Sequence, residues 1–339
     1  MRLNVLSHTF DAFTGYGRYA QHTVRSLIRG GVDVFPALMD TAALPGWLAR
    51  QAGFDASRIN LSVSSAYKFS PLAGRQVGLT MYESTRIPTE QVKKINAHLQ
   101  AVIVPAPFLV ETLENSGVEK PIYVVPGGVD PEEFPLMPKT NAERGRPFTF
   151  LALGDRGMRK GWDLAWFAFA RAFQGNEDVR FVVKTRANGL RDFDVINSDK
   201  RISVWREDVA NMNDVFAQAD CFIFPSFGEG YGLPPREAAL CGLPVLATQW
   251  GGMADVEQWG IPLTNYKMVD ALLDGGGQWA FPDIEELSEK MRWVYDNYAA
   301  AREQAYEKAQ WLRDNQTWTH SAQLLVKVLE GLGYDGAHN

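Results

Sequence analysis

Hydrophobic and polar positions along this chain form two alternating kinds of segment. Short apolar runs rich in Val, Ile, Leu and Phe are typical of buried strands. Longer stretches with an apolar residue every three or four positions are typical of helices that cover a sheet. Because the two kinds alternate from the first residues onward, the pattern predicts an α/β fold with parallel sheets.

The first half of the chain repeats this alternation several times. The expected strands lie near residues 2–7, 32–36, 58–63, 76–81, 101–104 and 121–125, and the expected helices near 17–29, 88–98 and 107–115. A stretch rich in proline and charge, 126–147, follows them and predicts a linker.

A second series begins after that stretch. Its expected strands lie near 147–153, 179–184, 201–205 and 221–224, its helices near 162–173 and 212–218, and residues 283–335 are expected to be helical apart from a break near Asn315. We infer two doubly wound domains that face each other across a cleft, because ligands of such sheets bind beyond the carboxyl ends of the strands.

Composition narrows the class of protein. A length of 339 residues fits two domains, and 46% hydrophobic with 22% charged residues is ordinary for a soluble globular protein. The net charge of −6 provides no basic footprint for nucleic acid or for an anionic membrane. Cys221 and Cys241 fall in an expected strand and an expected helix, so we expect buried free thiols. No apolar run approaches the roughly 20 residues of a transmembrane helix, and the N-terminus resembles a strand rather than a signal peptide, so we expect a cytoplasmic protein.

The most informative motif is Ser226–Gly242, which places Glu229 and Glu237 on either side of a glycine-rich loop. An expected strand, 221–224, precedes it, and two consecutive prolines suit the first turn of the helix that follows. A strand, a glycine-rich loop and a helix N-terminus together offer backbone N–H groups to a phosphate. A carboxylate in that loop would repel phosphate but accept hydrogen bonds from sugar hydroxyls. The stretch therefore predicts a site for a nucleotide sugar.

Taken singly, each glutamate has a simpler interpretation. Glu237 would only complement the helix dipole, which stabilises by roughly 0.3–1 kcal/mol, and Glu229 would be a solvated loop acid. The length and order of the whole motif favour the functional interpretation.

This motif resembles the signature of the retaining GT-B glycosyltransferases of family 4, also called group 1. The signature is a glutamate, seven residues, a second glutamate, an alanine-rich helix, Cys-Gly and a Pro-Val strand, which 241–248 complete here. The resemblance implies two Rossmann-like domains, 1–138 on the acceptor side and 139–316 for the nucleotide sugar. It also implies a C-terminal helix within 317–339 that packs back on the first domain.

The resemblance also implies roles for individual residues. Glu237 is expected to bind the ribose hydroxyls of the donor, and Glu229 to hold hydroxyls of the transferred sugar. The backbone N–H groups that are expected to meet the distal phosphate and the sugar belong to Gly230, Tyr231, Gly232 and Leu233.

A second part of the resemblance is Gly154–Asp163, which follows the first strand of the second domain. It is similar to the Gly-Arg…Lys-Gly element of the family, so Arg156 and Lys160 are expected to clamp the donor diphosphate, while Arg159 has no assigned role. Fixed cations there would stabilise the charge that develops on the leaving nucleoside diphosphate. A solvated basic turn is the simpler interpretation, and the motif downstream favours the clamp.

Weaker candidates come from other strand ends and turns. A glycine loop of the first domain leans over the donor phosphates in the family, and Gly15 and Gly17 fit it, with a glycine turn that binds nothing as the alternative. Lys184 at a strand end would add one more cation or would be solvated. Trp205 lies where the family reads the nucleotide base.

The first domain departs from the family at the position of its usual His near the donor sugar. Tyr82-Glu83-Ser84 occupies the corresponding stretch, and some family members carry such a run. Glu83 is therefore the candidate for contacting the acceptor or the reacting sugar, with a plain loop acid as the alternative. Gly127 also replaces the His or Asn that often precedes Gly-Val-Asp, so no catalytic role is assigned there.

The resulting hypothesis is a metal-independent retaining glycosyltransferase without a cofactor. It would move a sugar from a UDP- or GDP-sugar to a hydroxyl acceptor by same-face attack, with the leaving phosphate taking the acceptor proton. A sugar-nucleotide epimerase of the same fold and a non-catalytic binding protein are the alternatives; a glycoside hydrolase also uses two carboxylates but has no use for a phosphate clamp. The acceptor stays open between a small molecule, a lipid-linked sugar, a protein side chain and a modified nucleobase.

Overall fold

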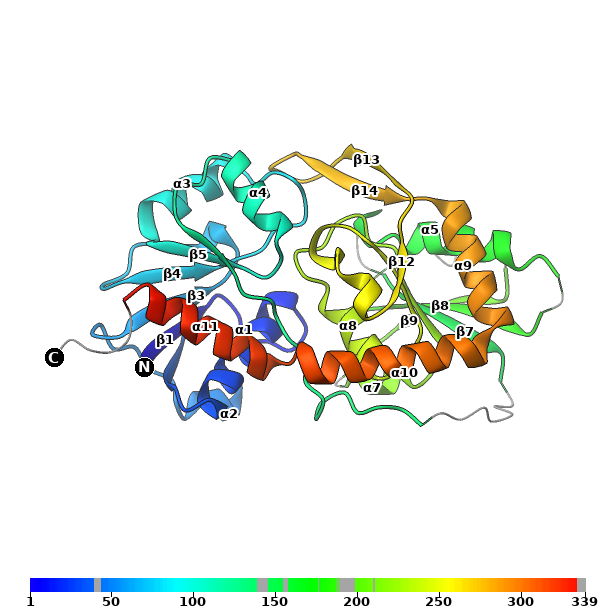
Figure 1. Ribbon diagram of the computed structural model, residues 1–339, viewed down its shortest axis with the longest axis horizontal. Helices are drawn as coiled ribbons and strands as arrows, with labels where there is room; N and C mark the ends of the chain where they lie inside the picture. The colour runs from blue at the N-terminus through cyan, green and yellow to red at the C-terminus, as the bar shows by residue number, and fades with distance from the viewer. Residues whose placement is uncertain are drawn as a thin grey trace. The chain divides into compact units, whose positions relative to one another are not determined.

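The computed structural model describes residues 1–39, 44–138, 146–154, 158–175, 177–187, 189, 199–209 and 211–333 (Figure 1). The chain folds into two compact units. The first contains Met1–Gly128, Asp270–Gln278 and Gln316–Asn339, and the second contains Val129–Val269 and Trp279–Asn315. The boundary falls at Gly128 rather than at residue 138, because Val129 and Phe134 are buried in the core of the second unit.

The first unit is built on a parallel sheet in the order β2-β1-β3-β4-β5-β6. The strand order reverses between β1 and β3, so the carboxyl ends of these two strands form a topological switch point, where doubly wound sheets bind ligands. The strands are β1 (Arg2–Ser7), β2 (Asp33–Leu38), β3 (Ile59–Val63), β4 (Gln76–Leu79), β5 (Ala101–Val104) and β6 (Ile122–Val124).

Helices pack on this sheet in two groups. One core cluster joins α3 and α4 to β5, with Ile95 and Leu109 buried near Val102 and Val104. Helix α1 packs along β1, β2 and β3, and α11 packs on α1. The helices of this unit are α1 (Gly15–Arg29), α2 (Gly46–Ala49), α3 (Thr89–His98), α4 (Phe108–Asn115) and α11 (Trp318–Gly331).

Aromatic contacts fix the last helix to the first. The ring of Trp318 on α11 stacks on His22 of α1 at a centroid distance of 5.0 Å. The same ring meets Tyr19 edge-on at 4.8 Å. The prediction that the C-terminal helix packs back on the first domain is confirmed.

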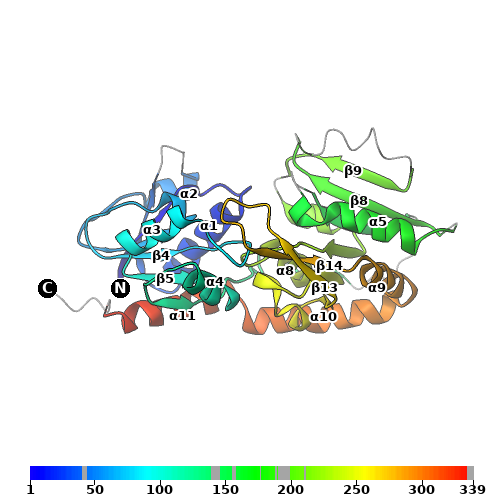
Figure 2. The same ribbon diagram turned by 90° about the horizontal axis from the view of Figure 1, so that it is seen from above.

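The second unit is built on another parallel sheet, in the order β12-β11-β10-β7-β8-β9. Its order reverses between β7 and β10, and β8 and β9 run side by side at one edge (Figure 2). The strands are β7 (Phe148–Leu153), β8 (Val179–Thr185), β9 (Ile202–Arg206), β10 (Cys221–Phe224), β11 (Val245–Thr248) and β12 (Ile261–Leu263).

Phenylalanines contribute to two separate buried clusters of the second unit. Phe169 of α5 packs against Phe150 of β7 and Phe181 of β8. Phe222 and Phe224 of β10 belong to a separate buried cluster that includes residues of α7 and α8. The helices of this unit are α5 (Trp162–Ala172), α7 (Met212–Phe216), α8 (Leu233–Leu240), α9 (Ile284–Asp296) and α10 (Tyr298–Asn315).

Two features of the C-terminal third differ from the predicted pattern. Strands β13 (Tyr266–Asp270) and β14 (Gln278–Pro282) form a two-stranded sheet that the sequence did not reveal. Most of β13 is exposed, so it lacks the apolar run that marks a buried strand. The predicted helical region is also interrupted at Asn297, which caps the end of α9.

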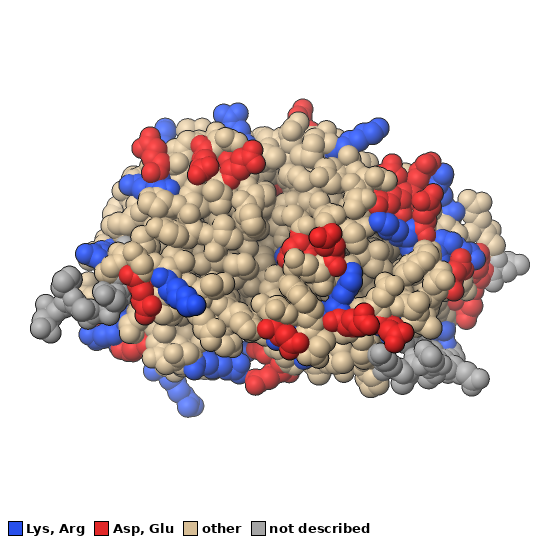
Figure 3. All heavy atoms as spheres, in the orientation of Figure 1, with Lys and Arg blue, Asp and Glu red and all other residues tan. Residues whose placement is uncertain are grey.

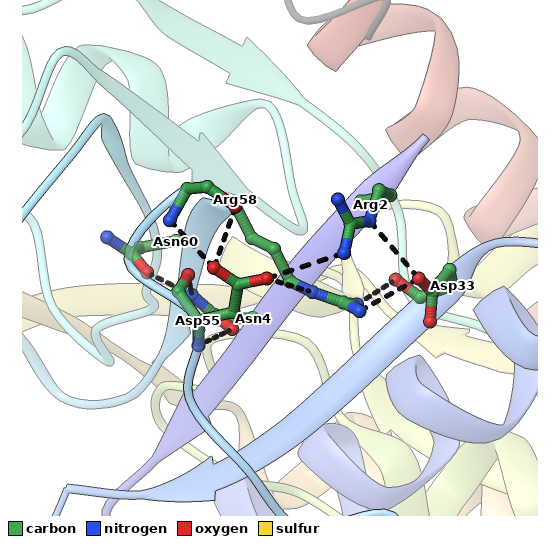
Figure 4. Close-up of polar contacts among 7 residues, drawn as sticks. Arg2, Asn4, Asp33, Asp55, Arg58 and Asn60 are labelled. Carbon is green, nitrogen blue, oxygen red and sulfur yellow. Dashed lines mark hydrogen bonds and ion pairs between the residues drawn. The ribbon is translucent and has the colours of Figure 1, made fainter.

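A polar network joins β1, β2 and β3 at the amino-terminal edge of the first sheet, opposite the switch point (Figure 4). Asn4 and Asn60 are both fully buried, and the Asn4 Nδ2 donates to Asn60 Oδ1 at 2.8 Å. Asn4 also bonds the backbone of Asp55 in both directions. Buried Arg58 pairs with Asp33 at 2.8 Å. Buried amides are tolerated because their partners are supplied.

Charge is mixed over the visible surface. On the face drawn in Figure 3, acidic and basic side chains are interspersed among uncharged ones. Within the described residues, no helix has both the length and the apolarity that a membrane crossing requires. Cys221 and Cys241 are buried free thiols, as predicted.

Candidate active site

Two loops meet at the switch point of the second sheet. One follows β7 and continues to α5, and the other follows the adjacent strand β10 and continues to α8. Gly161 starts α5 with a φ of +65°, and a Cβ there would lie 2.2 Å from the carbonyl oxygen of Pro225. Glycine adopts that backbone conformation without strain and leaves room for that approach, so Gly161 allows the two loops to touch.

Three side chains donate to a single oxygen of Glu229. Lys160 Nζ lies 2.7 Å from Glu229 Oε1, Arg159 Nη1 lies 3.0 Å from it, and Ser226 Oγ lies 2.7 Å from it. The Glu229 side chain is only 10% exposed. Within the residues that the structure describes, these three hydrogen bonds all use Oε1, which leaves Oε2 able to accept from a ligand hydroxyl.

The cations keep Glu229 ionised. Burial by itself would raise the pKa of the carboxyl, but Lys160, Arg159 and the Ser226 hydroxyl outweigh it and lower the pKa below its ordinary value. The group is therefore an acceptor of hydrogen bonds near neutral pH and not a proton donor.

Arg159, which the sequence analysis left without a role, contacts the same loop as Lys160. Besides its bond to Glu229, its Nη1 donates to the carbonyl of Gly228. Its own carbonyl accepts from the N–H of Phe227 at 2.7 Å. Arg156, the other predicted cation of this loop, lies outside the described residues.

Helix α8 presents the second carboxylate. Glu237 is buried within it, two positions after the two prolines of its first turn. Burial, and to a smaller extent the charge of Glu237, raises the pKa of Cys241 to about 12, which places that negative charge near the thiol. Because prolines have no N–H, the helix N-terminus offers its backbone donors mainly from Gly232 and Leu233.

A second layer supports the loop between Glu229 and α8. Gly252 N donates to the carbonyl of Glu229 at 2.8 Å, and a Cβ at Gly252 would lie 2.4 Å from Tyr231 N. The Arg236 guanidinium, 1% exposed, lies 4.2 Å from the Tyr231 ring and bonds Gly252 O at 2.9 Å and Asp255 at 2.8 Å. Neither Gly252 nor Arg236 was predicted as a site residue, because their role depends on contacts with a distant loop.

Lys184 and Trp205 form their own pair at the ends of β8 and β9. Lys184 Nζ lies 5.5 Å from the Trp205 ring centre and donates to the carbonyls of Thr185, at 2.8 Å, and Glu207. Burial lowers the pKa of Lys184 against the opposing charges of Asp208 and Glu207. The hydrogen bonds of this lysine thus hold β8 and β9 together and do not involve Glu229.

The two predicted glycines of the first unit lie in the first turn of α1, not in a loop before it. Thr14 caps this helix by accepting from Gly17 N at 3.1 Å. A Cβ at Gly17 would lie 2.1 Å from the carbonyl oxygen of Asp11, whereas Gly15 has nothing within 4 Å. Close packing against Asp11 therefore explains the glycine at Gly17, whereas no contact within the first unit explains the glycine at Gly15.

Glu83 lies in the loop after β4, close to the partly buried Tyr16. Tyr16 OH bonds the backbone of Met81, at 2.9 Å to its carbonyl, and lies 3.2 Å from Thr80 Oγ1. Burial raises the pKa of Tyr16; the hydrogen bond with Thr80 acts against this, and the Glu83 charge acts with it.

The switch point of the first sheet carries a polar pair that the sequence analysis missed. His8 follows β1 and Ser64 follows β3, and His8 Nδ1 lies 2.6 Å from Ser64 Oγ. The His8 ring also meets Tyr16 at 5.5 Å. A histidine directly after the first strand was the available signal.

A sequence model of the "Family 4 Glycosyltransferase in conflict systems" matches residues 106–325, which is more than half of the chain. A D-inositol 3-phosphate glycosyltransferase of Arthrobacter sp. (strain FB24) is 31% identical over 155 residues, with 39% of this chain and 35% of the relative covered. The GPI3 subunit of phosphatidylinositol N-acetylglucosaminyltransferase of Saccharomyces cerevisiae (strain YJM789) is 29% identical over 147 residues, with 40% and 32% covered. The chain thus matches about a third of the length of these relatives.

Solved structures match the whole fold. HepE of Anabaena, in complex with UDP and glucose, superposes with a TM-score of 0.72 at 13% identity, covering 98% of this chain and 100% of the other. Sucrose-phosphate synthase of Thermosynechococcus elongatus gives 0.72 and 13%, covering 98% and 99%. The predicted GT-B architecture of two Rossmann-like sheets is confirmed. This chain belongs to the family 4 glycosyltransferases of conflict systems.

Proposed function

We propose that this chain transfers a sugar from a nucleotide diphosphate sugar to a hydroxyl acceptor, with retention of configuration and without a metal ion or cofactor. The observation that carries the proposal is the convergence of Lys160, Arg159 and Ser226 on Glu229 at the switch point of the second sheet. A UDP-sugar is the first candidate donor, because HepE, which shares the fold, is described in complexes with UDP and with UDP-glucose.

The proposed roles of the individual residues follow from their charges. Glu229, held ionised, accepts hydrogen bonds from hydroxyls of the transferred sugar. Lys160 has three N–H donors and shares one with Glu229, so it can also contact the diphosphate. Arg159, and Arg156 by the family pattern, would add charge there. Glu237 would bind the ribose, and N–H groups from Gly230 to Leu233 the distal phosphate.

The proposed retention comes from the resemblance to retaining enzymes, and the contacts of Glu229 bear on the route. Glu229 has its charge satisfied by two cations and a hydroxyl, which makes it a poor nucleophile toward a sugar carbon. We therefore propose same-face attack, in which the acceptor O–H bonds to the sugar as the C–O bond to phosphate breaks, and the departing phosphate oxygen takes the proton. The cations stabilise the leaving diphosphate, as a divalent metal ion does in metal-dependent enzymes. Gly15, Gly17, Lys184, Trp205 and Glu83 remain proposed contacts for phosphate, base or acceptor.

The experiment measures release of nucleoside diphosphate from UDP-, GDP- and ADP-sugars, with water as the acceptor. Lys160→Met is expected to lower kcat/KM by about a hundredfold, the usual effect of removing one group that stabilises developing charge. Lys290→Met is the matched control, because Lys290 also pairs with a glutamate, Glu286, at 2.6 Å but on α9.

Each outcome separates the proposal from its alternatives. EDTA should leave the rate unchanged, and the released or transferred sugar should keep the anomeric configuration of the donor in NMR spectra. An isomeric nucleotide sugar without nucleotide release would identify an epimerase. Binding without any turnover would favour a non-catalytic protein.

A further inference from the structure

The hairpin of β13 and β14, drawn in gold in Figure 1, is a segment to which the proposed reaction gives no task. Its tip and its second strand belong to different units. Asp270–Gln278 is part of the first unit, whereas Trp279 and the rest of β14 are part of the second. One continuous strand therefore has neighbours in both units.

The tip of the hairpin is hydrogen-bonded to the loop that carries Glu83. Ser84, which is fully buried, places its Oγ 2.9 Å from the carbonyl of Gly276. Thr85 N donates to Gln278 O at 3.3 Å, and Gln278 N donates back to Thr85 Oγ1 at 2.9 Å. These contacts involve the two residues that follow Glu83 in the sequence.

The glycines of the tip make this close contact possible. A Cβ at Gly275 would lie 2.7 Å from Arg86 O, and a Cβ at Gly277 would lie 2.7 Å from Arg86 N. Gly277 also has a φ of +81°, which glycine adopts without strain. The tip is thus fitted backbone to backbone against the Glu83 loop, and any side chain at Gly275 would push the two apart.

The second strand of the hairpin contacts the loop that carries Glu229. Ala280 N donates to Phe227 O at 2.9 Å, and the Phe281 ring lies 4.8 Å from the Phe227 ring. Phe227 N in turn donates to Arg159 O. Strand β14 is therefore bonded to the segment between the cation loop and Glu229.

We propose that β14 is a strap that couples the donor loop to the Glu83 loop. A ligand that engages Lys160, Arg159 and Glu229 constrains Phe227, and β14 passes that constraint along the covalent chain from Trp279 to Gln278 and on to Ser84 and Thr85. The donor then orders the Glu83 loop before the acceptor arrives. This inference rests on the proposed function, since it takes the nucleotide sugar as the ligand of the Glu229 loop.

The test is hydrogen–deuterium exchange of the full chain with and without saturating UDP. Exchange should slow by about threefold or more in peptides covering Glu229–Glu237 and also in those covering 82–87 and 270–278, since local opening sets exchange rates. Slower exchange at Glu229–Glu237 with unchanged exchange at 82–87 would overturn the strap. If UDP and the other nucleoside diphosphates leave the exchange rate of Glu229–Glu237 unchanged, the proposed function is wrong. The proposed strap would then have no ligand to respond to.

Two variants make the test specific. Gly275→Ala should abolish the UDP-dependent slowing at 82–87 while leaving the Kd for UDP within about twofold, because the substitution lies outside the donor loop. Leu272→Ser, in the same tip but 77% exposed, should keep both responses. Ser84→Ala, which removes one hydroxyl and adds no bulk, should weaken the slowing in the same way. A full response in both Gly275→Ala and Ser84→Ala would overturn the proposal.

Discussion

Lys160 Nζ lies 2.7 Å from Glu229 Oε1, although the two residues belong to loops 69 positions apart in the sequence. The contact exists because β7 and β10 are neighbours at the point where the strand order reverses. A parallel sheet brings the loops after such strands to one edge, and Gly161 allows them to touch. The pair places a fixed negative charge beside fixed positive charge, which is the arrangement that the proposed binding of a sugar next to a diphosphate would use.

The first prediction concerns the pH dependence of this pair. Because the folded pKa of Glu229 is lowered, its stabilisation is present above the ordinary glutamate pKa and is lost as pH falls through the folded value. Glu229→Gln should therefore be less stable than the wild type at pH 7, by roughly 1.5–3 kcal/mol for charged hydrogen bonds. Urea unfolding should show this gap closing below about pH 4.

Glu285→Gln serves as its control, because the Glu285 pair with Arg171 is exposed on both sides. That change should cost no more than about 0.5 kcal/mol at any pH. A Glu229→Gln gap that stayed constant from pH 7 to pH 3 would mean that the carboxylate is not held ionised by its neighbours.

The second prediction uses the two glycines that begin α1. Gly17→Ala should destabilise the protein by about 1–3 kcal/mol, because its Cβ would overlap Asp11 O. Gly15→Ala has open space and should leave stability unchanged or raise it by up to about 1 kcal/mol. Thermal unfolding of both variants checks this.

Gly15→Ala then tests a binding role without a folding defect. If Gly15 lets the backbone approach the donor phosphates, the Kd for UDP should rise by about tenfold, or 1.4 kcal/mol. An unchanged Kd would remove Gly15 from the site and leave it a helix-start glycine.

The third prediction concerns the support behind the Glu229 loop. Arg236→Lys should lower stability by about 2–4 kcal/mol, because Lys lacks the planar fork that bonds Gly252 and Asp255 and stacks between the Tyr231 and Trp259 rings. Urea unfolding measures the loss. Full stability in Arg236→Lys would show that charge alone, without the stacking, is enough at this position.

The fourth prediction concerns the amino-terminal edge of the first sheet (Figure 4). Asn4→Leu should cost about 1–3 kcal/mol, since it removes the bonds of Asn4 to the buried Asn60 Oδ1 and to the Asp55 backbone. Arg2→Ala, whose side chain is 61% exposed, should cost less than about 1 kcal/mol. Similar losses in the two variants would contradict the view that the buried amides dominate this network.

The sequence was informative where burial on both faces makes a strand apolar. The expected strands at 101–104 and 221–224 match β5 and β10 residue for residue. It failed where this signal is absent, as in exposed β13. The hydrophobic pattern therefore did not predict the β13–β14 hairpin or its hydrogen bond with Ser84.

The site shows the same division. Glu229, Glu237 and Lys160 could be chosen because motif spacing fixes them on one strand–loop–helix unit and one neighbouring loop. Arg159, Ser226 and Arg236 were missed because their partners are defined by how two loops approach in space. The role of Glu83 stays a prediction.

The most direct measurement is calorimetric titration of the wild type and Glu237→Ala with UDP, GDP and ADP and their sugar conjugates. The account predicts saturable binding of one nucleotide family, weakened at least about tenfold by the substitution, or 1.4 kcal/mol. Absence of binding to every nucleotide, or equal affinity in Glu237→Ala, would contradict the assignment of the donor site to the Glu229–Glu237 loop.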